Sequence, residues 1–234
     1  MPEEHGRSAV TAPHLKICGL ARREDAVIAA DAGASYLGAI FAAESPRAVT
    51  AAQAGRMLAG LAPRRVGVFV NSSTRDLVDT AATAGLHVLQ LHGEESPAQL
   101  RELRGCGEWA LWKAVRVREP ADFAAAIDRF APWVDGLLLD TWSPSARGGT
   151  GSVFPWEEVA VHRDRLPAAV ALIAAGGLRA DNLARAVALL RPATVDISSG
   201  VESAPGIKDP AAIRAVVRTL RSLSTDKRVH DGHH

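Results

Sequence analysis

Short apolar runs recur along the chain, separated by longer alanine-rich segments in which apolar and polar residues alternate with a helical period. The runs are nearly continuous in apolar residues, a pattern typical of strands that are covered on both faces of a parallel sheet. We count eight of them: HLKIC at 14–18, YLGAIF at 36–41, RVGVFV at 65–70, HVLQLH at 87–92, ALWKAV at 110–115, VDGLLLD at 134–140, AVALIAA at 169–175 and TVDISS at 194–199.

The segments between these runs carry the signals of helix ends. The clearest predicted starts are Thr50, Ser73, Asp181 and Asp209. Ser73 is followed by Asp76 at the third position, as in a capping box, and Gly85 is the expected stop of that helix. Asp209 precedes a proline at the first helical position. The pattern therefore predicts helices that alternate with the strands.

Eight strands that alternate with helices predict βα units and a parallel sheet. Eight is also the number that closes a (β/α)8 TIM barrel, whose typical length of about 250 residues suits this chain. The alternative is an open doubly wound sheet, which needs a G-x-G-x-x-G turn after its first strand, and ICGLARRE at 17–24 lacks it. We predict one barrel over 14–223, with a mobile N-terminal extension at 1–13 and a mobile C-terminal tail at 224–234.

Composition and charge narrow the classes of function. The formal net charge of +1 argues against a broad basic surface for nucleic acid. Two cysteines do not form a disulfide framework and indicate a reducing compartment. No apolar run approaches the ~20 residues of a membrane span, and the first residues do not resemble a secretory signal. We expect a cytoplasmic protein, monomeric or homodimeric, that binds a small molecule and neither nucleic acid nor membrane.

In a (β/α)8 barrel the C-terminal ends of the strands form the mouth where active sites lie. The seventh run ends in Gly176 and Gly177, and the eighth ends in Ser198, Ser199 and Gly200. Loops at these two strands often bind phosphate, because glycines let backbone N–H groups approach the anion and hydroxyls add donors. The alternative is that the glycines only serve a tight turn between strand and helix. Together the two loops favour a phosphate site.

A thiol and a carboxyl group end the first and sixth runs. Strand periodicity places Lys16 and Cys18 on one face, and Leu138 and Asp140 on one face. In a ring of eight, these strands are three steps apart, so the two groups would flank a ligand as general base and general acid. Cys18 could instead be a buried small hydrophobe, and Asp140 could anchor a loop.

An ordered set of motifs carries a resemblance to a known family. The motifs are KICG, EDA, AGA, LGAIF, SPR, VGVFVN, LQLHGEE, LLLDT, GGTG, AGGL and VDISSGVESAPGIKD. Together they resemble the phosphoribosylanthranilate isomerase family, whose members are (β/α)8 enzymes of tryptophan biosynthesis. The resemblance runs from about Lys16 to the last predicted helix, in the family's order.

This resemblance implies an Amadori rearrangement of N-(5-phosphoribosyl)anthranilate to 1-(2-carboxyphenylamino)-1-deoxyribulose 5-phosphate, with no cofactor and no metal. By the family's motifs, Cys18 is the general base and Asp140 the general acid. We expect the apolar run before Asp140 to raise its pKa by desolvation, so that it holds a proton near neutral pH. We expect Lys16, if it points inward, to favour the Cys18 thiolate.

The resemblance also assigns residues that bind the substrate. It implies that Arg47 of SPR binds the anthranilate carboxylate with its guanidinium fork, although a solvated surface arginine is the alternative. It places Asp196 at the mouth. His92 matches the family motif, and we expect it to structure the mouth rather than to act in catalysis. The glycines and serines at the ends of strands seven and eight would bind the 5-phosphate.

Three other functions compete with this assignment. ProFAR isomerase of histidine biosynthesis uses an aspartate at the end of strand one and a substrate phosphorylated at both ends, whereas this chain has Cys18 there. A metal-dependent pentose-phosphate epimerase needs several His and Asp ligands, and only His92 is a candidate. A catalytically silent barrel that serves as a binding subunit would not need both a thiol and a carboxyl group at its mouth.

Overall fold

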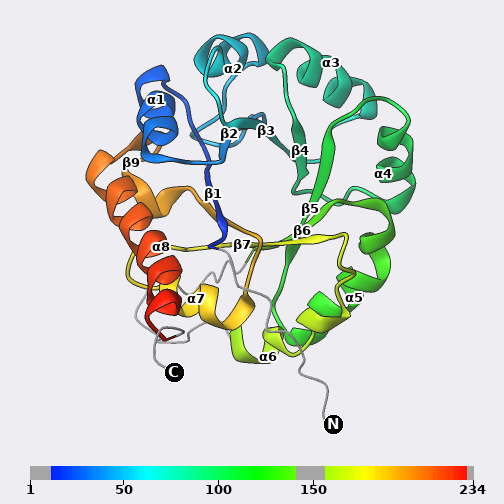
Figure 1. Ribbon diagram of the computed structural model, residues 1–234. Coiled ribbons are helices and arrows are strands. Elements are labelled where there is room, and N and C mark those ends of the chain that lie inside the picture. The colour runs from blue at the N-terminus through cyan, green and yellow to red at the C-terminus, as the bar shows by residue number, and fades with distance from the viewer. Residues whose placement is uncertain (1–11, 141–155, 231–234) are drawn as a thin grey trace.

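The computed structural model describes residues 12–140 and 156–230, and side chains within 12–140 and 156–223. Eight parallel strands form a closed barrel in the order β1 to β8 (Figure 1). They are β1 His14–Ile17, β2 Tyr36–Ile40, β3 Arg64–Phe69, β4 Val88–Leu91, β5 Ala110–Arg116, β6 Gly136–Asp140, β7 Ala171–Ala175 and β8 Thr194–Ile197. Closure pairs β1 with β8, with Lys16 opposite Asp196. The predicted barrel is confirmed, and the open sheet is excluded.

A ring of helices surrounds the strands (Figure 1). The helices are α1 Arg23–Ala32, α2 Ala51–Leu58, α3 Thr74–Ala84, α4 Pro97–Arg104, α5 Pro120–Phe130, α6 Trp156–Ala160, α7 Leu183–Leu190 and α8 Pro210–His230. Short elements complete the description: the 3-10 turns η1 Ala131–Trp133, η3 Arg163–Arg165 and η4 Ser199–Val201, and the hairpin strands β9 Glu202–Ala204 and β10 Ile207–Lys208. The strand and helix order follows the predicted alternation.

Side-chain caps set most of the predicted helix starts. Thr50 forms a full capping box with Gln53 at the start of α2. The hydroxyl of Ser73 accepts a hydrogen bond from the backbone N–H of Asp76 at 3.1 Å. Gly85 ends α3 with φ +62°, a left-handed conformation that glycine adopts without strain. The predicted starts of α2 and α3 and the predicted end of α3 are therefore confirmed.

The predicted start of the seventh helix at Asp181 is wrong. α7 begins at Leu183, and its N-cap is Asn182. The Asn182 side chain accepts a hydrogen bond from Arg179 N at 2.9 Å and donates one to Gly177 O at 3.0 Å. This turn occupies the residues just after β7, so the helix begins later.

The apolar residues form two layers. The larger one lies between the strands and the surrounding helices. The smaller one fills the barrel itself and consists of Val66, Val88, Trp112, Ala114, Leu138, Ile173 and Ala175. Beside this inner layer, Lys16, Gln90 and Asp196 are buried polar residues on β1, β4 and β8. The barrel therefore presents a polar group of side chains next to its apolar filling.

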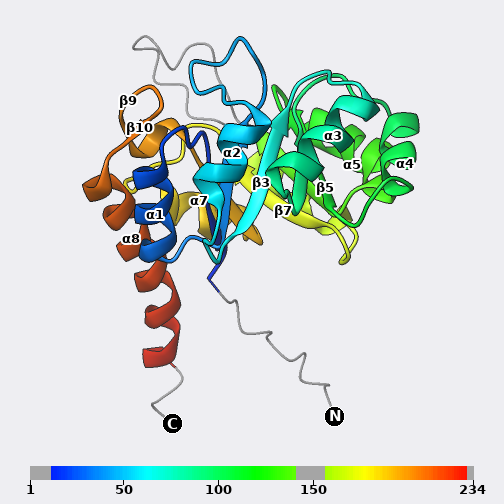
Figure 2. The ribbon, with the colours of Figure 1, turned by 90° about the horizontal axis from the view of Figure 1, so that it is seen from above.

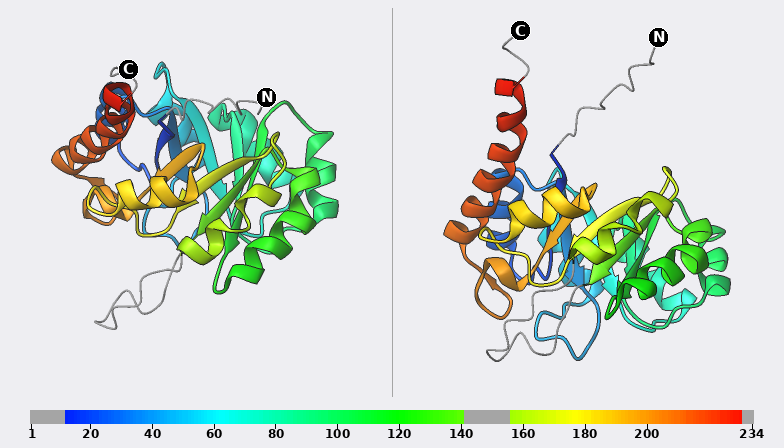
Figure 3. Two further views of the ribbon diagram at one scale, coloured as in Figure 1. Left: turned by 60° about the horizontal axis from the view of Figure 1, so that its bottom comes forward. Right: turned by 90° about the horizontal axis from the view of Figure 1, so that it is seen from below.

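The two ends of the barrel differ. The hairpin β9–β10 and the loop between β2 and α2 lie at one end, while the C-terminal part of α8 projects from the other (Figures 2 and 3). α8 continues to His230, past the expected end of the barrel at residue 223. The predicted extension at 1–13 and the end of the predicted tail lie largely outside the described residues. Among the helices described, none is long and apolar enough to cross a membrane.

Candidate active site

Buried polar side chains from three strands meet near the C-terminal end of the barrel. Lys16 on β1 is fully buried, and its Nζ donates to Asp196 Oδ2 on β8 at 2.7 Å. Gln90 on β4 lies 3.4 Å from the same oxygen. Asp196 Oδ1 and Gln90 Oε1 are buried and have no hydrogen-bond partner among the described residues. Buried polar atoms are nearly always paired, so both oxygens are candidate acceptors for a polar ligand.

Cys18 lies directly after β1, with its side chain buried and its N–H donating to Ile197 O at 2.9 Å. Burial raises the pKa of the Cys18 thiol, and Asp196 adds to this effect. The charges of Lys16 and Lys208 and a hydrogen bond with Lys16 lower the pKa of Cys18, but they do not outweigh burial. Lys16 thus points inward and favours the thiolate as expected, yet the net result is a thiol that is protonated at neutral pH.

Replacing Lys16 with methionine is expected to lower the free energy of unfolding by about 3–5 kcal/mol. The substitution leaves the Asp196 carboxylate buried without its cation, which is the costly way to break an ion pair. Denaturant unfolding measures the change. As a control, Arg185→Gln removes an exposed pair with Glu157 and should cost much less, because solvent screens that pair. If both variants lowered the free energy of unfolding equally, the buried ion pair of Lys16 and Asp196 would be contradicted.

A glycine on β2 makes room for the Cys18 side chain. A Cβ added at Gly38 would lie 2.9 Å from Cys18 Sγ, 3.1 Å from Cys18 Cα and 3.1 Å from Lys16 Cε. The second of these three atoms belongs to the backbone, so a side-chain rotation cannot relieve the crowding there. The absence of a side chain at position 38 therefore fixes where the thiol lies.

Gly38→Ala is expected to reduce kcat/KM by about 10²-fold, because a misplacement of about 1 Å at a reacting group costs that much. The overpacking should also lower the free energy of unfolding by about 1–3 kcal/mol. Steady-state kinetics of the purified variant measures kcat/KM. Gly105→Ala is the matched control, since its added Cβ would meet only Glu102 O at 3.4 Å, an ordinary separation. An unchanged rate in Gly38→Ala would show that the Cys18 position is not critical.

Asp140 is the last residue of β6 and is half-buried. It pairs in register with Arg116 on β5 and Ala175 on β7, and Leu138, two residues earlier, is buried in the inner apolar layer. In the closed barrel, β7 and β8 separate β6 from β1 on one side, so Asp140 and Cys18 lie three strand steps apart. The expected rise in the Asp140 pKa stays a prediction, and the loop that follows, at 141–155, lies outside the described residues.

The loops after β7 and β8 touch one another. Gly176 and Gly177 have φ values of +81° and +65°, in the left-handed region that glycine populates freely. A Cβ added at Gly200 would lie 1.9 Å from Leu178 O, so only glycine fits there. Ser198 is half-buried and Ser199 exposed at the start of η4. The structure thus brings together the residues predicted to bind phosphate.

His92 lies just past β4 beside the buried polar group. Its Nε2 is 2.6 Å from Gln90 Nε2. Burial, aided by the charges of Lys16, Lys113 and Arg116, lowers the pKa of His92 to about 3. The ring is therefore neutral near pH 7, which agrees with a role in shaping the mouth and does not suit a general acid.

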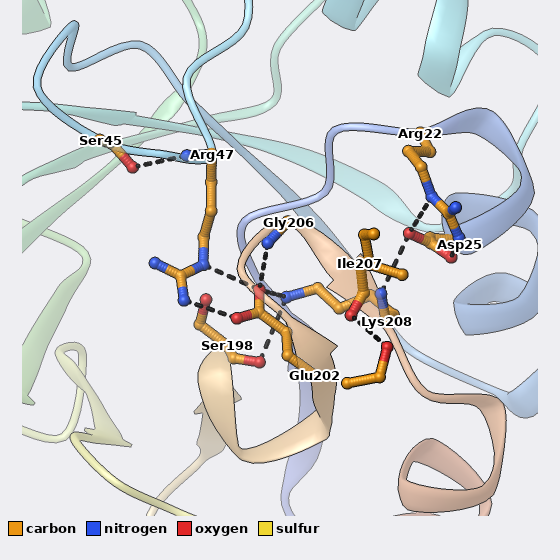
Figure 4. A network of polar contacts seen from close by, with 10 residues as sticks. Arg22, Asp25, Ser45, Arg47, Ser198, Glu202, Gly206, Ile207 and Lys208 are labelled. Carbon is orange, nitrogen blue, oxygen red and sulfur yellow. Dashed lines mark hydrogen bonds and ion pairs between the residues drawn. The ribbon is translucent and has the colours of Figure 1, made fainter.

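Arg47 does not behave as a solvated surface arginine. It is held in the loop after β2, is 19% exposed, and forms a fork with Glu202: Nε donates to Oε1 at 2.8 Å and Nη2 to Oε2 at 2.5 Å (Figure 4). Lys208 Nζ donates to Glu202 Oε1 at 2.7 Å. Glu202 and Lys208 received no role from the sequence, although they lie in the GVESAPGIKD segment after strand eight. The signal that could have found Glu202 and Lys208 is that two charged residues follow the eighth strand, close to the predicted mouth of the barrel.

A second buried pair supports the opposite side of the mouth. Lys113 Nζ lies 3.0 Å from Glu95 Oε2, and Glu95 Oε1 accepts hydrogen bonds from Asn71 N and Gly93 N, both at 3.0 Å. This pair fixes the loops after β3 and β4. Cys106 is exposed and lies away from this site, just after α4. Within the residues described, no group of three or more His, Cys, Asp or Glu side chains is arranged to hold a metal ion.

A closed (β/α)8 barrel with a thiol, a carboxyl group and paired glycine-rich loops at the strand ends is typical of the acid–base isomerases of sugar phosphates. A family model for N-(5'-phosphoribosyl)anthranilate (PRA) isomerase matches residues 15–219. The chain belongs to this family and is an isomerase, so the resemblance seen in its motifs is confirmed.

Individual relatives agree with this assignment. The N-(5'-phosphoribosyl)anthranilate isomerase of a Pseudomonas putida strain is 44% identical over 209 residues, which cover 88% of this chain and 96% of that protein. The crystal structure of the Thermotoga maritima phosphoribosyl anthranilate isomerase has a TM-score of 0.80 at 34% identity, covering 90% and 99% of the two chains. Another phosphoribosyl anthranilate isomerase, with a TM-score of 0.78 at 32% identity and the same coverage, was solved in complex with reduced 1-(o-carboxyphenylamino)-1-deoxyribulose 5-phosphate.

Proposed function

We propose that this isomerase converts N-(5-phosphoribosyl)anthranilate to 1-(2-carboxyphenylamino)-1-deoxyribulose 5-phosphate, with Asp140 as general acid and Cys18 as general base. The assignment of the two roles rests on where the two groups lie in the barrel. The carboxyl group ends β6, the thiol follows β1, and the two strands between them carry the paired glycine-rich loops. A sugar phosphate held by those loops would lie between an acid and a base.

The reaction begins at the furanose ring. Asp140 gives its proton to the ring oxygen as the bond between C1 and that oxygen breaks. The lone pair of the anilino nitrogen forms a C=N bond, which leaves a protonated imine and an open ribose chain. Asp140 is then a carboxylate. The leaving oxygen is protonated as it departs, so the step does not require a free alkoxide.

The second step is the removal of the C2 proton. The Cys18 thiolate takes this proton, the C–H electron pair forms a C1=C2 bond, and the electrons of the C=N bond return to nitrogen. The product is an enolamine, which tautomerises to the aminoketone as the hydroxyl proton of C2 is lost and C1 is protonated. No electrons are gained or lost overall, so the chemistry needs proton transfer alone.

Three cations surround Cys18 and favour its thiolate. The charges of Lys16 and Lys208 lower its pKa, and the charge of Cys18 in turn raises the pKa of Arg47. The positive imine makes the C2 proton more acidic, so a thiolate of moderate basicity is sufficient. Cys18 is mainly a thiol in the unliganded protein, and the reactive thiolate is therefore a minor form that these cations stabilise.

The remaining contacts hold the substrate. The loops with Gly176, Gly177, Ser198, Ser199 and Gly200 bind the 5-phosphate. Arg47 binds the anthranilate carboxylate, and Asp196, with one unpaired buried oxygen, accepts a hydrogen bond from a ribose hydroxyl. His92 shapes the mouth. The reduced product analogue found in a related structure supports a ligand with these three groups.

The test of the function is turnover of phosphoribosylanthranilate made in situ, followed as the loss of anthranilate-type fluorescence. The purified protein should consume it and release the aminoketone. Binding of reduced 1-(o-carboxyphenylamino)-1-deoxyribulose 5-phosphate with no turnover would instead favour a catalytically silent barrel. Faster turnover of the doubly phosphorylated ProFAR would favour the histidine-pathway isomerase.

A further inference from the structure

We propose that Glu202 is a positioning residue that holds Arg47 so that the outer edge of its guanidinium group faces the carboxylate of the substrate. The inference deepens the proposed function and rests on it, because it requires a carboxylated ligand. It concerns a residue to which neither the sequence motifs nor the acid–base mechanism gives a role.

The donor geometry of arginine allows Arg47 to bind two carboxylates at once. A guanidinium group offers two edges with two donors each, one formed by Nε and Nη2 and the other by Nη1 and Nη2. Glu202 occupies the first edge of Arg47, with distances of 2.8 and 2.5 Å. No described residue forms a hydrogen bond with Nη1, and Figure 4 shows the third guanidinium nitrogen pointing away from Glu202. A second carboxylate can therefore bind end-on without displacing the first.

Glu202 is itself held rigidly. Its side chain is 5% exposed, and Oε1 accepts hydrogen bonds from Lys208 Nζ at 2.7 Å and from Gly206 N at 3.3 Å. Lys208 Nζ also donates to Ser198 O at 3.2 Å, and Lys208 N donates to Asp25 Oδ2 at 3.2 Å (Figure 4). The fork is thereby tied to the loop after β8, which is the predicted phosphate loop, and to α1.

The charges around the fork are unequal. Glu202 supplies one negative charge to two cations, Arg47 and Lys208, while the nearby Asp25 is paired with Arg22. Burial opposes ionisation of Glu202, but hydrogen bonds from both cations leave its pKa below the usual value, so it is a carboxylate. One positive charge is left over. A carboxylate arriving at the outer edge of Arg47 would balance it.

The stem of Arg47 is fixed next to the base. A Cβ added at Gly19 would lie 2.6 Å from Arg47 Cδ and 2.8 Å from Ser198 Oγ, so these two side chains pack against the backbone that follows Cys18. The carboxylate-binding edge, the phosphate loop and the thiol are thus held in one packed unit. Glu202 fixes the rotation of the guanidinium group within that unit.

The opposite interpretation is that Glu202 imitates the substrate carboxylate and has to be displaced by it. The two interpretations predict opposite signs. If Glu202 positions Arg47, removing its charge weakens the binding of a carboxylated ligand. If Glu202 competes, removing its charge strengthens that binding.

Calorimetry with two probes separates these possibilities. The probes are reduced 1-(o-carboxyphenylamino)-1-deoxyribulose 5-phosphate and the same compound without the carboxyl group. We expect the wild type to bind the first about 10- to 100-fold more tightly, as a charge-assisted fork provides. Glu202→Gln should lose most of this preference and leave the affinity for the second probe nearly unchanged. The double variant with Arg47→Lys should behave as Arg47→Lys alone.

The controls cover the ways in which the test can fail. Glu157→Gln removes a matched but exposed pair with Arg185 and should keep the full preference. Arg47→Lys keeps a cation beside Glu202 and removes the outer edge, so a preference retained in that variant overturns the inference even if Glu202→Gln does not fold. Tighter binding of the first probe by Glu202→Gln also overturns it. A wild type that binds neither probe overturns the proposed function. Equal binding of both probes overturns this inference and the carboxylate-binding role proposed for Arg47, but leaves the proposed reaction standing.

Discussion

Replacing Cys18 with alanine is expected to lower kcat by about 10²–10⁴-fold, the contribution that a positioned general base makes. Alanine removes only the sulfur atom of the buried side chain, so the fold should survive and the loss should be chemical. Fluorescence-detected turnover measures kcat, and the thermal unfolding midpoint reports on the fold. The affinity for the reduced product analogue should change little, because Cys18 acts on the C2 proton and makes no other contact in the proposed complex.

The pH profile gives a second check on this base. Because Cys18 must be a thiolate while Asp140 still holds its proton, kcat/KM should be level between the two pKa values and should fall above the Cys18 pKa, which burial places at a higher pH than in an ordinary cysteine. Cys106→Ala is the control, since that thiol is exposed and lies between α4 and the start of β5, not at the C-terminal end of a strand. A Cys18→Ala enzyme with more than a tenth of the wild-type rate would mean that another group is the base.

The positions of the strand ends could be predicted because they depend on local patterns. The apolar run at 134–140 becomes β6 at Gly136–Asp140, and the run at 14–18 becomes β1 at His14–Ile17 with Cys18 directly after it. In a closed parallel barrel all these ends lie at one mouth. The pattern of apolar runs was therefore enough to predict that Cys18 and Asp140 lie at the same end of the barrel.

The ion-pair cluster of Arg47, Glu202 and Lys208 could not be predicted in the same way. Its members come from the loop after β2 and from the hairpin after β8, more than 150 positions apart in the sequence. Which carboxylate meets which cation depends on how the hairpin folds over the loop, and no local period encodes that. The motif matching gave Arg47 a role but left its partner Glu202 without one.

The electrostatic balance at Cys18 was predicted only in part. The sequence indicated that Lys16 lies beside the thiol and favours the thiolate, which is the direction found. Burial has the larger effect, and it depends on the complete packing of the barrel. Neighbours along a strand can be inferred from sequence, but the extent to which water is excluded cannot.

The site thus has two regions with different charge balance. Below the thiol, Lys16 and Asp196 form a buried neutral pair that serves the fold as well as the site. Toward the loop after β2, Arg47, Lys208 and Glu202 carry one net positive charge. We therefore expect an anionic substrate to be attracted to the second region, while the first region supports Cys18 in its proposed role as base. This division explains why a protein with a net charge of only +1 can hold a ligand with a phosphate and a carboxylate.

Asp140→Asn is expected to lower kcat by about 10²–10⁴-fold, comparable to the loss of the base. Asparagine has nearly the same shape as aspartic acid, but it cannot deliver a proton to the ring oxygen, so the furanose would have to open without acid assistance. The same fluorescence assay measures the rate. Asp135→Asn, at the other end of the same strand, removes a carboxylate that bonds Leu111 N and Arg104 and should leave the rate unchanged.

The pH dependence of this acid has a definite sign. Asp140 must carry a proton when the substrate binds, so kcat/KM should stop rising once the pH passes the Asp140 pKa, because the gain in Cys18 thiolate is then offset by the loss of protonated Asp140. If the apolar run before Asp140 raises that pKa, as the sequence indicates, NMR titration of the side-chain carboxyl in the wild type should place it above the usual range of aspartic acid. A normal aspartate pKa, both in the unliganded enzyme and in its complex with the reduced product analogue, would contradict this. The proton would then have to come from another donor at the mouth, and Asp140→Asn should keep most of its activity.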